Sequence, residues 1–343
     1  LWKKGLLYRG PQRSDDGRYL LYSVQDGGSD WRTLRVFDVA TKRVLRDEVH
    51  WAKYTELAWV GSEGFFYSRF PEPAADGAFQ DPNYNQSIWY HRIGTPQSRD
   101  ELVFATPDHP ERRHTAEVTD DGRLAVITSS IGTDARYEVH TIDLERRDGV
   151  GWQAEPLVTG FDHDWKLVDG VGRTLWFVTN QDAPRYRLVA INLAVNQPRW
   201  HELVPQGEDT LQRGTIIGQQ LILSYLHNAA TRALIYDLRG RSIRTLSLRD
   251  IGTASGFRGK AGDPETFYSF SSFNRPQGIY RMDLASGESK PFAEPDIAFD
   301  PDDYDVDQRF FTSKDGTRVP MFVVRGKDAA RKNRPLPTLL YGY

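Results

Sequence analysis

The chain has 343 residues, which is long enough for one large or two ordinary domains. Its net charge of −3 and pI of about 6.3 provide no basic field for nucleic acid, and no apolar run reaches the roughly 18 residues of a membrane span. Cysteine is absent, which excludes disulfides, thiolate metal sites and a cysteine nucleophile.

The N-terminal residues 1–5 contain no signal-peptide core and do not begin with Met. We therefore expect this end to be cut rather than native, and the chain to be an excerpt of a longer protein. Any signal sequence would precede Leu1, so the compartment stays open between cytoplasm and periplasm.

A hairpin pattern recurs along the chain at a regular spacing. Each copy has an apolar run, a polar turn and a second apolar run, and Asp-Gly between two such runs is the strongest short hairpin signal. Two clear copies and four weaker ones cover residues 13–23, 118–128, 58–67, 167–177, 217–224 and 260–269.

A third strand follows the hairpins and ends in an Asp or Asn between apolar residues, at 36–39, 141–144, 190–193, 235–238 and 281–284. A shorter fourth strand comes next, as at 156–158 and 201–205. Four antiparallel strands at a regular period are typical of a β-propeller blade, and about six blades fit between residues 10 and 295. A β-sandwich or two stacked barrels are the alternatives, and the regular spacing argues against both.

The C-terminal part departs from this rhythm. Residues 306–324 predict an additional hairpin around Lys314-Asp315-Gly316, and the apolar run 336–343 is typical of a buried strand that opens into a loop.

The motifs of common active sites are missing from the sequence. It contains no Gly-x-Ser-x-Gly nucleophile elbow, no phosphate-binding Gly-x-x-x-x-Gly-Lys-Ser and no His-Glu-x-x-His. The Asp-Gly segments lack the alternating carboxylates of a calcium loop, so we interpret them as ordinary turns, in which Asp and Gly are favoured residues. We expect no metal and no cofactor, and we expect each of the eight histidines to be a surface or packed residue.

Several motifs, in their order along the chain, resemble the prolyl oligopeptidase family of serine peptidases. The matching segments are 28–31, 53–59, 90–95, 270–273, 312–324 and 336–343. The resemblance implies an all-β chain: a seven-bladed propeller lacking its first blade over residues 1–303, followed by the first strands of an α/β-hydrolase domain over 304–343.

The family implies that the parent protein is a serine endopeptidase that cleaves short peptides after proline. Its partners would be short proline-containing peptides, with no nucleic acid or membrane, and it would be a soluble monomer. The propeller would gate and size-filter the substrate. Two alternatives stay open: cleavage after Arg or Lys, as in oligopeptidase B, and a propeller that serves only as a non-enzymatic binding scaffold.

The resemblance assigns roles to single residues. Tyr343 would donate its hydroxyl to the oxyanion of the tetrahedral intermediate, with aromatic packing as the alternative. The Pro-rich insertion at 70–85 would help to gate substrate entry, or be a plain surface loop.

A substrate pocket is the other implied site. Tyr54, Arg113 and Thr133 would line the pocket for the residue two before the proline, although packing or a solvated surface is an alternative for each. Arg113 stands where well-known members have an apolar residue, and it would favour acidic residues upstream of the cleavage site. Asp30 would pair with a basic residue of the catalytic domain, or cap a turn through its own backbone.

Overall fold

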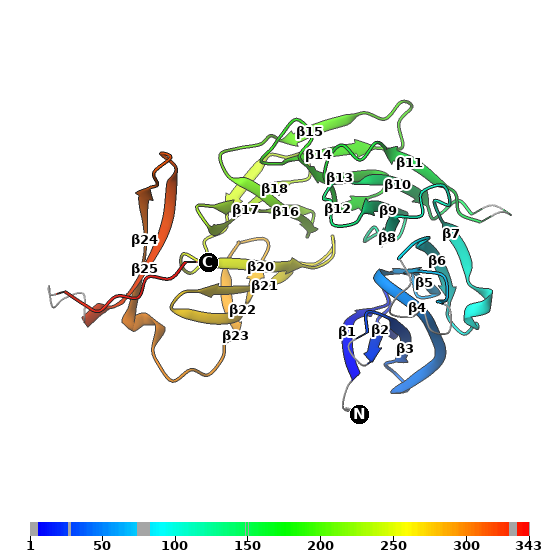
Figure 1. Cartoon of the computed structure of the whole chain (residues 1–343), viewed down its shortest axis with the longest axis horizontal. Coiled ribbons are helices and arrows are strands. Elements are labelled where there is room, and N and C mark those ends of the chain that lie inside the picture. Colours follow the sequence, from blue (N-terminus) through cyan, green and yellow to red (C-terminus); the bar gives the residue numbers. More distant parts are fainter. Residues whose placement is uncertain are drawn as a thin grey trace. The chain divides into compact units, whose positions relative to one another are not determined.

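The computed structural model describes residues 6–26, 29–73, 83–147, 149, 151–328 and 335–342, and strands dominate it (Figure 1). The chain divides into two compact units. The first contains residues 1–182 and 190–201, and the second contains residues 183–189 and 202–343. Within the described residues, no helix has the length and apolar character that a membrane crossing requires.

The first unit begins with a seven-stranded antiparallel sheet in sequential order. Its central strand β4 is long because its first half pairs with β3, up to Ala52, and its second half pairs with β5, at Ala52 and then from Leu57 to Val60. The sheet is therefore two four-stranded blades that share one strand. Its strands are β1 Leu6–Arg13, β2 Tyr19–Asp26, β3 Arg32–Asp38, β4 Arg43–Val60, β5 Gly64–Arg69, β6 Ser87–Arg92 and β7 Glu101–Phe104.

Two four-stranded sheets follow, and the boundary between the units passes through the second of them. Both sheets are meanders in which sequential strands pair. Their strands are β8 Arg112–Val118, β9 Leu124–Ile131, β10 Glu138–Asp143 and β11 Ala154–Val158, then β12 Trp165–Val171, β13 Thr174–Thr179, β14 Arg187–Asn192 and β15 Trp200–Val204.

The second unit adds two more four-stranded sheets and a separate hairpin. With these, the described residues form six blades, in line with the roughly six that the sequence predicts, and the all-β propeller organisation is confirmed. The strands are β16 Thr210–Ile217, β17 Gln220–His227, β18 Ala230–Asp237, β19 Ser242–Thr245, β20 Thr253–Arg258, β21 Glu265–Ser272, β22 Arg275–Asp283, β23 Ser289–Ala293, β24 Tyr304–Thr312 and β25 Arg318–Gly326; short 3₁₀ helices cover Gln97–Arg99 and Pro301–Asp303.

The Asp-Gly turns form as the sequence indicates. In the first, Ser14 Oγ donates to Asp16 Oδ1 over 2.7 Å, and the Gly17 N–H donates to the Ser14 carbonyl over 2.9 Å. Gly17 has a φ of 70°, which only glycine adopts without strain. The same turn recurs at residues 119–122 and 313–316, where a Thr or Ser hydroxyl again bonds the turn aspartate.

Apolar side chains that alternate along the strands pack between neighbouring sheets. In the first unit, Phe66 and Ile88 of the second blade pack with Ile127 and Ile142 of the third, and all four are fully buried. This packing fixes β4, β5 and β6 against β8, which carries part of the candidate site. In the second unit, a comparable cluster joins the sheets β16–β19 and β20–β23.

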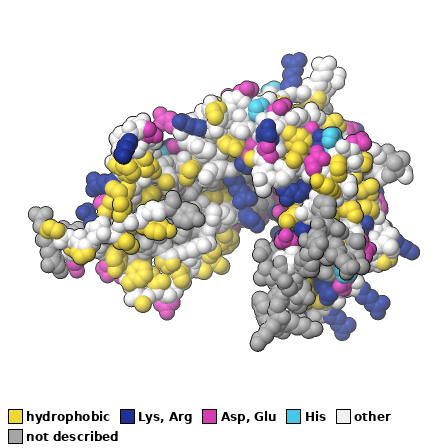
Figure 2. All heavy atoms as spheres, viewed as in Figure 1, with side chains coloured by type: hydrophobic (Ala, Val, Ile, Leu, Met, Phe, Trp, Pro, Cys, Tyr) yellow, Lys and Arg dark blue, Asp and Glu magenta, His cyan; other side chains and the backbone are white. Residues whose placement is uncertain are grey.

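The second unit exposes apolar side chains on its surface (Figure 2). Phe273 and Phe292 are each 63% exposed. The last described segment is also exposed: Leu339, Leu340 and Tyr341 are 91%, 84% and 80% accessible, in place of the buried strand that the sequence predicts. A strand needs a neighbour for its backbone hydrogen bonds, and no described strand pairs with residues 335–342.

Candidate functional site

Tyr54 lies where strand β4 passes from one blade to the next. The ladder with β5 breaks between Ala52 and Leu57, and both Trp51 and Tyr54 have a positive φ, 62° and 51°. This conformation is unusual for residues with a side chain, and it bends the strand. The bend brings the Tyr54 ring out of the sheet, where it is 40% exposed.

Two other predicted site residues meet this ring. The Tyr54 hydroxyl donates to Asp30 Oδ2 over 3.1 Å, and the Arg113 guanidinium lies 5.2 Å from the ring centroid. Burial, followed by the hydrogen bond and charge of Asp30, raises the pKa of Tyr54, while the charge of Arg113 partly offsets this rise. The phenol therefore stays protonated and acts as a donor near neutral pH.

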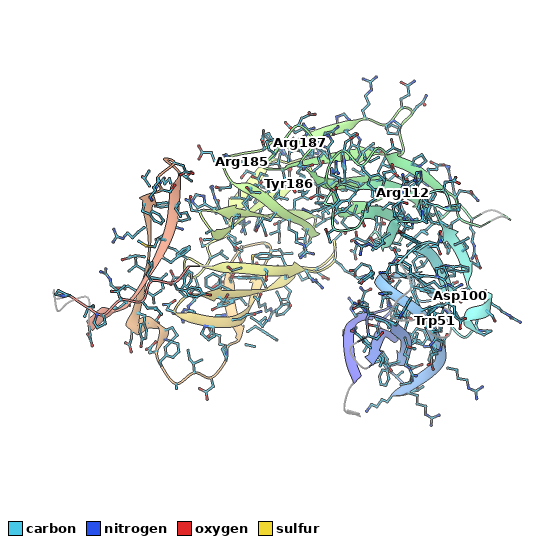
Figure 3. All side chains as sticks on the ribbon, in the orientation of Figure 1. Trp51, Asp100, Arg112, Arg185, Tyr186 and Arg187 are labelled. Carbon is cyan, nitrogen blue, oxygen red and sulfur yellow. The ribbon has the colours of Figure 1, made fainter. Side chains whose placement is uncertain are left out.

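Other aromatic side chains pack against the Tyr54 ring through Phe70. Phe70 is buried and meets Tyr54 edge-on, with 6.5 Å between ring centroids, and it meets Trp31 in the same way at 6.2 Å. Trp51, labelled in Figure 3, packs edge-on against Trp31. The Lys53 ammonium lies 5.0 Å from the Trp31 ring and 5.3 Å from the Tyr54 ring. The patch thus combines aromatic faces with two cations, and it offers contacts to both apolar and acidic groups.

Thr133 lies two residues after the end of β9, and no described contact joins it to this patch. It follows β9, whose Ser130 pairs with Arg113, and it is exposed just after Gly132, which has a φ of 58°. Among the described residues, Thr133 makes no hydrogen bond to Tyr54 or Arg113. The structure therefore brings together Asp30, Tyr54 and Arg113, and it shows no contact between Thr133 and these three residues.

Two other sequence expectations fall on residues that the structure does not describe. Tyr343 lies outside the described residues, and so do residues 74–82 of the insertion at 70–85.

Gln86 belongs to this site, although no sequence motif indicates it. Its side chain is 1% exposed and bonds the backbone beside both Tyr54 and Arg113. A single Gln before an apolar strand is a common feature, so the sequence alone could not single it out.

Two buried histidines lie in the same unit, and their pKa values are shifted in opposite directions. His91 bonds Asp100 over 2.7 Å and Asp47 over 3.1 Å, and Asp100, labelled in Figure 3, also accepts the Tyr67 hydroxyl. Burial alone would lower the pKa of His91, but its bonds to Asp100 and Asp47 outweigh it and raise the pKa to about 9.

His114 is the neutral member of the two. Burial, helped by the charge of Arg112, lowers the pKa of His114 to about 4. Its ring nitrogens face the hydroxyls of Ser129 and Thr106, at 2.8 and 3.0 Å. Among the described residues this Ser–His pair has no carboxylate partner, and both side chains are fully buried, so the pair cannot reach a substrate. Both histidines are packed structural residues, as the sequence predicts.

Comparisons with known proteins agree with this architecture. The sequence model of the prolyl oligopeptidase N-terminal β-propeller domain matches residues 9–295. The prolyl endopeptidase of Elizabethkingia meningoseptica is 32% identical over 330 residues, which cover 95% of this chain and 46% of that protein. The chain therefore spans about half the length of the curated relatives it matches.

Solved structures agree as well. A chain from a structural and mechanistic analysis of two prolyl endopeptidases has 44% identity and a TM-score of 0.85, over 94% of this chain and 46% of that one. Prolyl oligopeptidase B from Galerina marginata has 25% identity and the same TM-score, over 94% of this chain and 47% of its own.

Proposed function

The chain belongs to the prolyl oligopeptidase family, whose N-terminal propeller it matches, and we propose that it serves a serine endopeptidase that cleaves short peptides after proline. The observation that carries the proposal is the coverage of 95% of the chain by a relative named prolyl endopeptidase. The propeller would occupy residues 1–303, and residues 304–343 would begin an α/β-hydrolase domain.

The chemistry follows from the triad that such a domain would supply. Its Ser would attack the carbonyl carbon of the proline, and its His would take the Ser proton and pass it to the leaving amine. Tyr343 would donate its hydroxyl to the oxyanion, together with a backbone N–H. A phenol aimed at the developing charge stabilises the transition state more than the ground state.

The propeller would contribute the wall for the residue two before the proline. Tyr54 would offer its exposed ring edge, Thr133 would lie at the rim, and Arg113 would attract an acidic side chain. The contact between Arg113 and the Tyr54 ring supports this proposal, because it places a cation beside an apolar surface within one patch.

Asp30 and the insertion at 70–85 complete the proposal. Asp30 is exposed while it holds the Tyr54 hydroxyl, and it would also meet a basic residue of the catalytic domain. The insertion would gate entry, so that only short peptides reach the enclosed site, where water is excluded.

A peptide panel tests the function. The complete protein is incubated with short peptides that differ only in having Pro, Arg, Lys or Ala before the scissile bond. We expect cleavage after Pro. Cleavage after Arg and Lys would instead indicate an oligopeptidase B-like enzyme, and no cleavage by the folded protein would indicate a binding scaffold.

A further inference from the structure

The buried carboxamide of Gln86 bridges the two sides of the Tyr54 patch. Its Nε2 donates to the carbonyls of Lys53 and Tyr54, over 2.9 and 3.3 Å. Its Oε1 accepts the N–H of His114 over 2.7 Å. One side chain that is 1% exposed thus ties the backbone of Tyr54 to the residue after Arg113.

The backbone at Tyr54 needs such a partner. The ladder between β4 and β5 skips from Ala52 to Leu57, so residues 53–56 have no backbone ladder pair in β5. Tyr54 also holds a φ of 51°, which costs a residue with a side chain about 1 kcal/mol. Gln86 satisfies two carbonyls at this bend, and it thereby stabilises a conformation that the strand itself does not favour.

A second bridge runs parallel to the first. Ser68 Oγ donates to the His114 carbonyl over 2.6 Å, and the Ser68 N–H donates to Thr55 Oγ1 over 2.7 Å. Ser68 is fully buried, and Thr55 is 5% exposed. Two buried polar links therefore connect the strand segment that carries Tyr54 with the one that carries Arg113.

From this geometry we propose that Gln86 is a positioning residue, which sets the Tyr54 ring and the Arg113 guanidinium at a fixed separation for recognition of the residue two before the proline. The inference rests on the proposed peptidase function. Gln86 touches no substrate. It acts through the backbone of Tyr54 and His114, and so through the 5.2 Å contact between Tyr54 and Arg113.

The test measures selectivity rather than total activity. For the complete protein, kcat/KM is measured with two peptides that carry Glu or Gln two residues before the proline. The ratio of the two values is independent of how much enzyme is folded, so a general loss of stability does not change it. We expect Gln86→Met, which keeps the side-chain length but removes the hydrogen bonds, to lower the Glu/Gln ratio by about three-fold, mainly through KM.

Thr266→Val is the matched control. Thr266 is also 1% exposed and donates to a backbone carbonyl, that of Arg258, over 2.8 Å. It lies in a different blade, so its loss should lower stability by a similar amount and leave the ratio unchanged.

A double-mutant cycle tests the route of the effect. Arg113→Met should bring the ratio to about one, and Gln86→Met added to it should cause no further change. If Arg113→Met shifts the ratio and Gln86→Met does not, the role of Gln86 is overturned while the pocket stands. If neither variant changes the Glu/Gln ratio, both the pocket assignment and the role of Gln86 are overturned.

Ser68→Ala is the second test variant, and it is used if Gln86→Met does not fold. This variant cuts only the parallel link, and we expect it to lower the ratio in the same direction by a smaller factor. With no folded Gln86→Met, an unchanged ratio in Ser68→Ala overturns the proposal. A complete protein that cleaves no proline peptide at all would instead refute the proposed function.

Discussion

The Tyr54 hydroxyl donates a hydrogen bond to Asp30 across 3.1 Å, so a residue of the loop before β3 fixes the orientation of a ring that projects from the bend of β4. The Tyr54 side chain is therefore fixed at its Cα by the strained backbone and at its hydroxyl by the Asp30 carboxylate.

Tyr54→Phe and Tyr54→Ala separate the two parts of this arrangement. Tyr54→Phe keeps the ring and loses only the bond to Asp30, so we expect kcat/KM to fall by no more than about five-fold, without a change in preference. Tyr54→Ala removes the surface itself and should change the preference two residues before the proline. A peptide panel with varied residues at that position measures both effects. Equal profiles for Tyr54→Ala and the native protein would place Tyr54 outside the pocket.

The free energy of unfolding should decrease at alkaline pH because of His91. Its pKa is raised to about 9 in the folded state from about 6.5 in the unfolded chain, so its contribution is complete below pH 6.5 and disappears as the pH rises toward 9. One proton corresponds to about 1.4 kcal/mol per pH unit. Urea unfolding of the chain, followed by Trp fluorescence, should show this slope in the native protein and lose it in His91→Gln.

His114 should cause the free energy of unfolding to decrease at acidic pH. Its pKa is lowered to about 4, so the folded state keeps it neutral, and its contribution is present above pH 6.5 and lost as the pH falls toward 4. His114→Gln should flatten the slope between pH 6.5 and 4 and leave the decrease at alkaline pH intact. An acid slope that is the same in both proteins would show that other groups dominate there.

Gly64 is a position where any side chain should be destabilising. A Cβ there would lie closer than 3 Å to the carbonyl oxygen of His91 and to the ring of Tyr90, and both belong to the paired strand β6. We expect Gly64→Ala to lower the free energy of unfolding by about 1–3 kcal/mol. Gly207→Ala is the control, because a Cβ at Gly207 meets nothing within 4 Å and should change stability by less than about 0.5 kcal/mol.

Tyr343→Phe tests the proposed oxyanion donor. Loss of one donor to a tetrahedral intermediate costs about 100-fold in rate, and the ground state does not use that bond. In the complete protein, kcat should therefore fall by about this factor while KM stays within about two-fold. A kcat equal to that of the native protein would remove Tyr343 from the mechanism.

The blades were predictable because their signals are local. Asp-Gly turns between apolar runs, as at Asp16-Gly17, specify a hairpin through their own side chains, and strand alternation follows from burial of one face. The sharing of β4 by two blades was not predictable, since it depends on a bend at Trp51 and Tyr54, residue types that give no turn signal.

The site was predictable only in part. The resemblance placed Tyr54 and Arg113 in one pocket, and the structure brings them within 5.2 Å. It did not indicate the bond from Tyr54 to Asp30 or the bridge through Gln86. Both contacts join residues far apart in sequence, and the partners of Gln86 are backbone atoms, which leave no mark on residue type.

The most direct test of the account is charge reversal at Arg113. The ratio of kcat/KM is measured for two proline peptides with Glu or Lys two residues before the proline, in the native protein and in Arg113→Glu. The account predicts a preference for Glu in the native protein and a shift of about ten-fold toward Lys in the variant, which weakens as salt is added. An unchanged ratio would contradict the claim that this face of the propeller contacts the substrate.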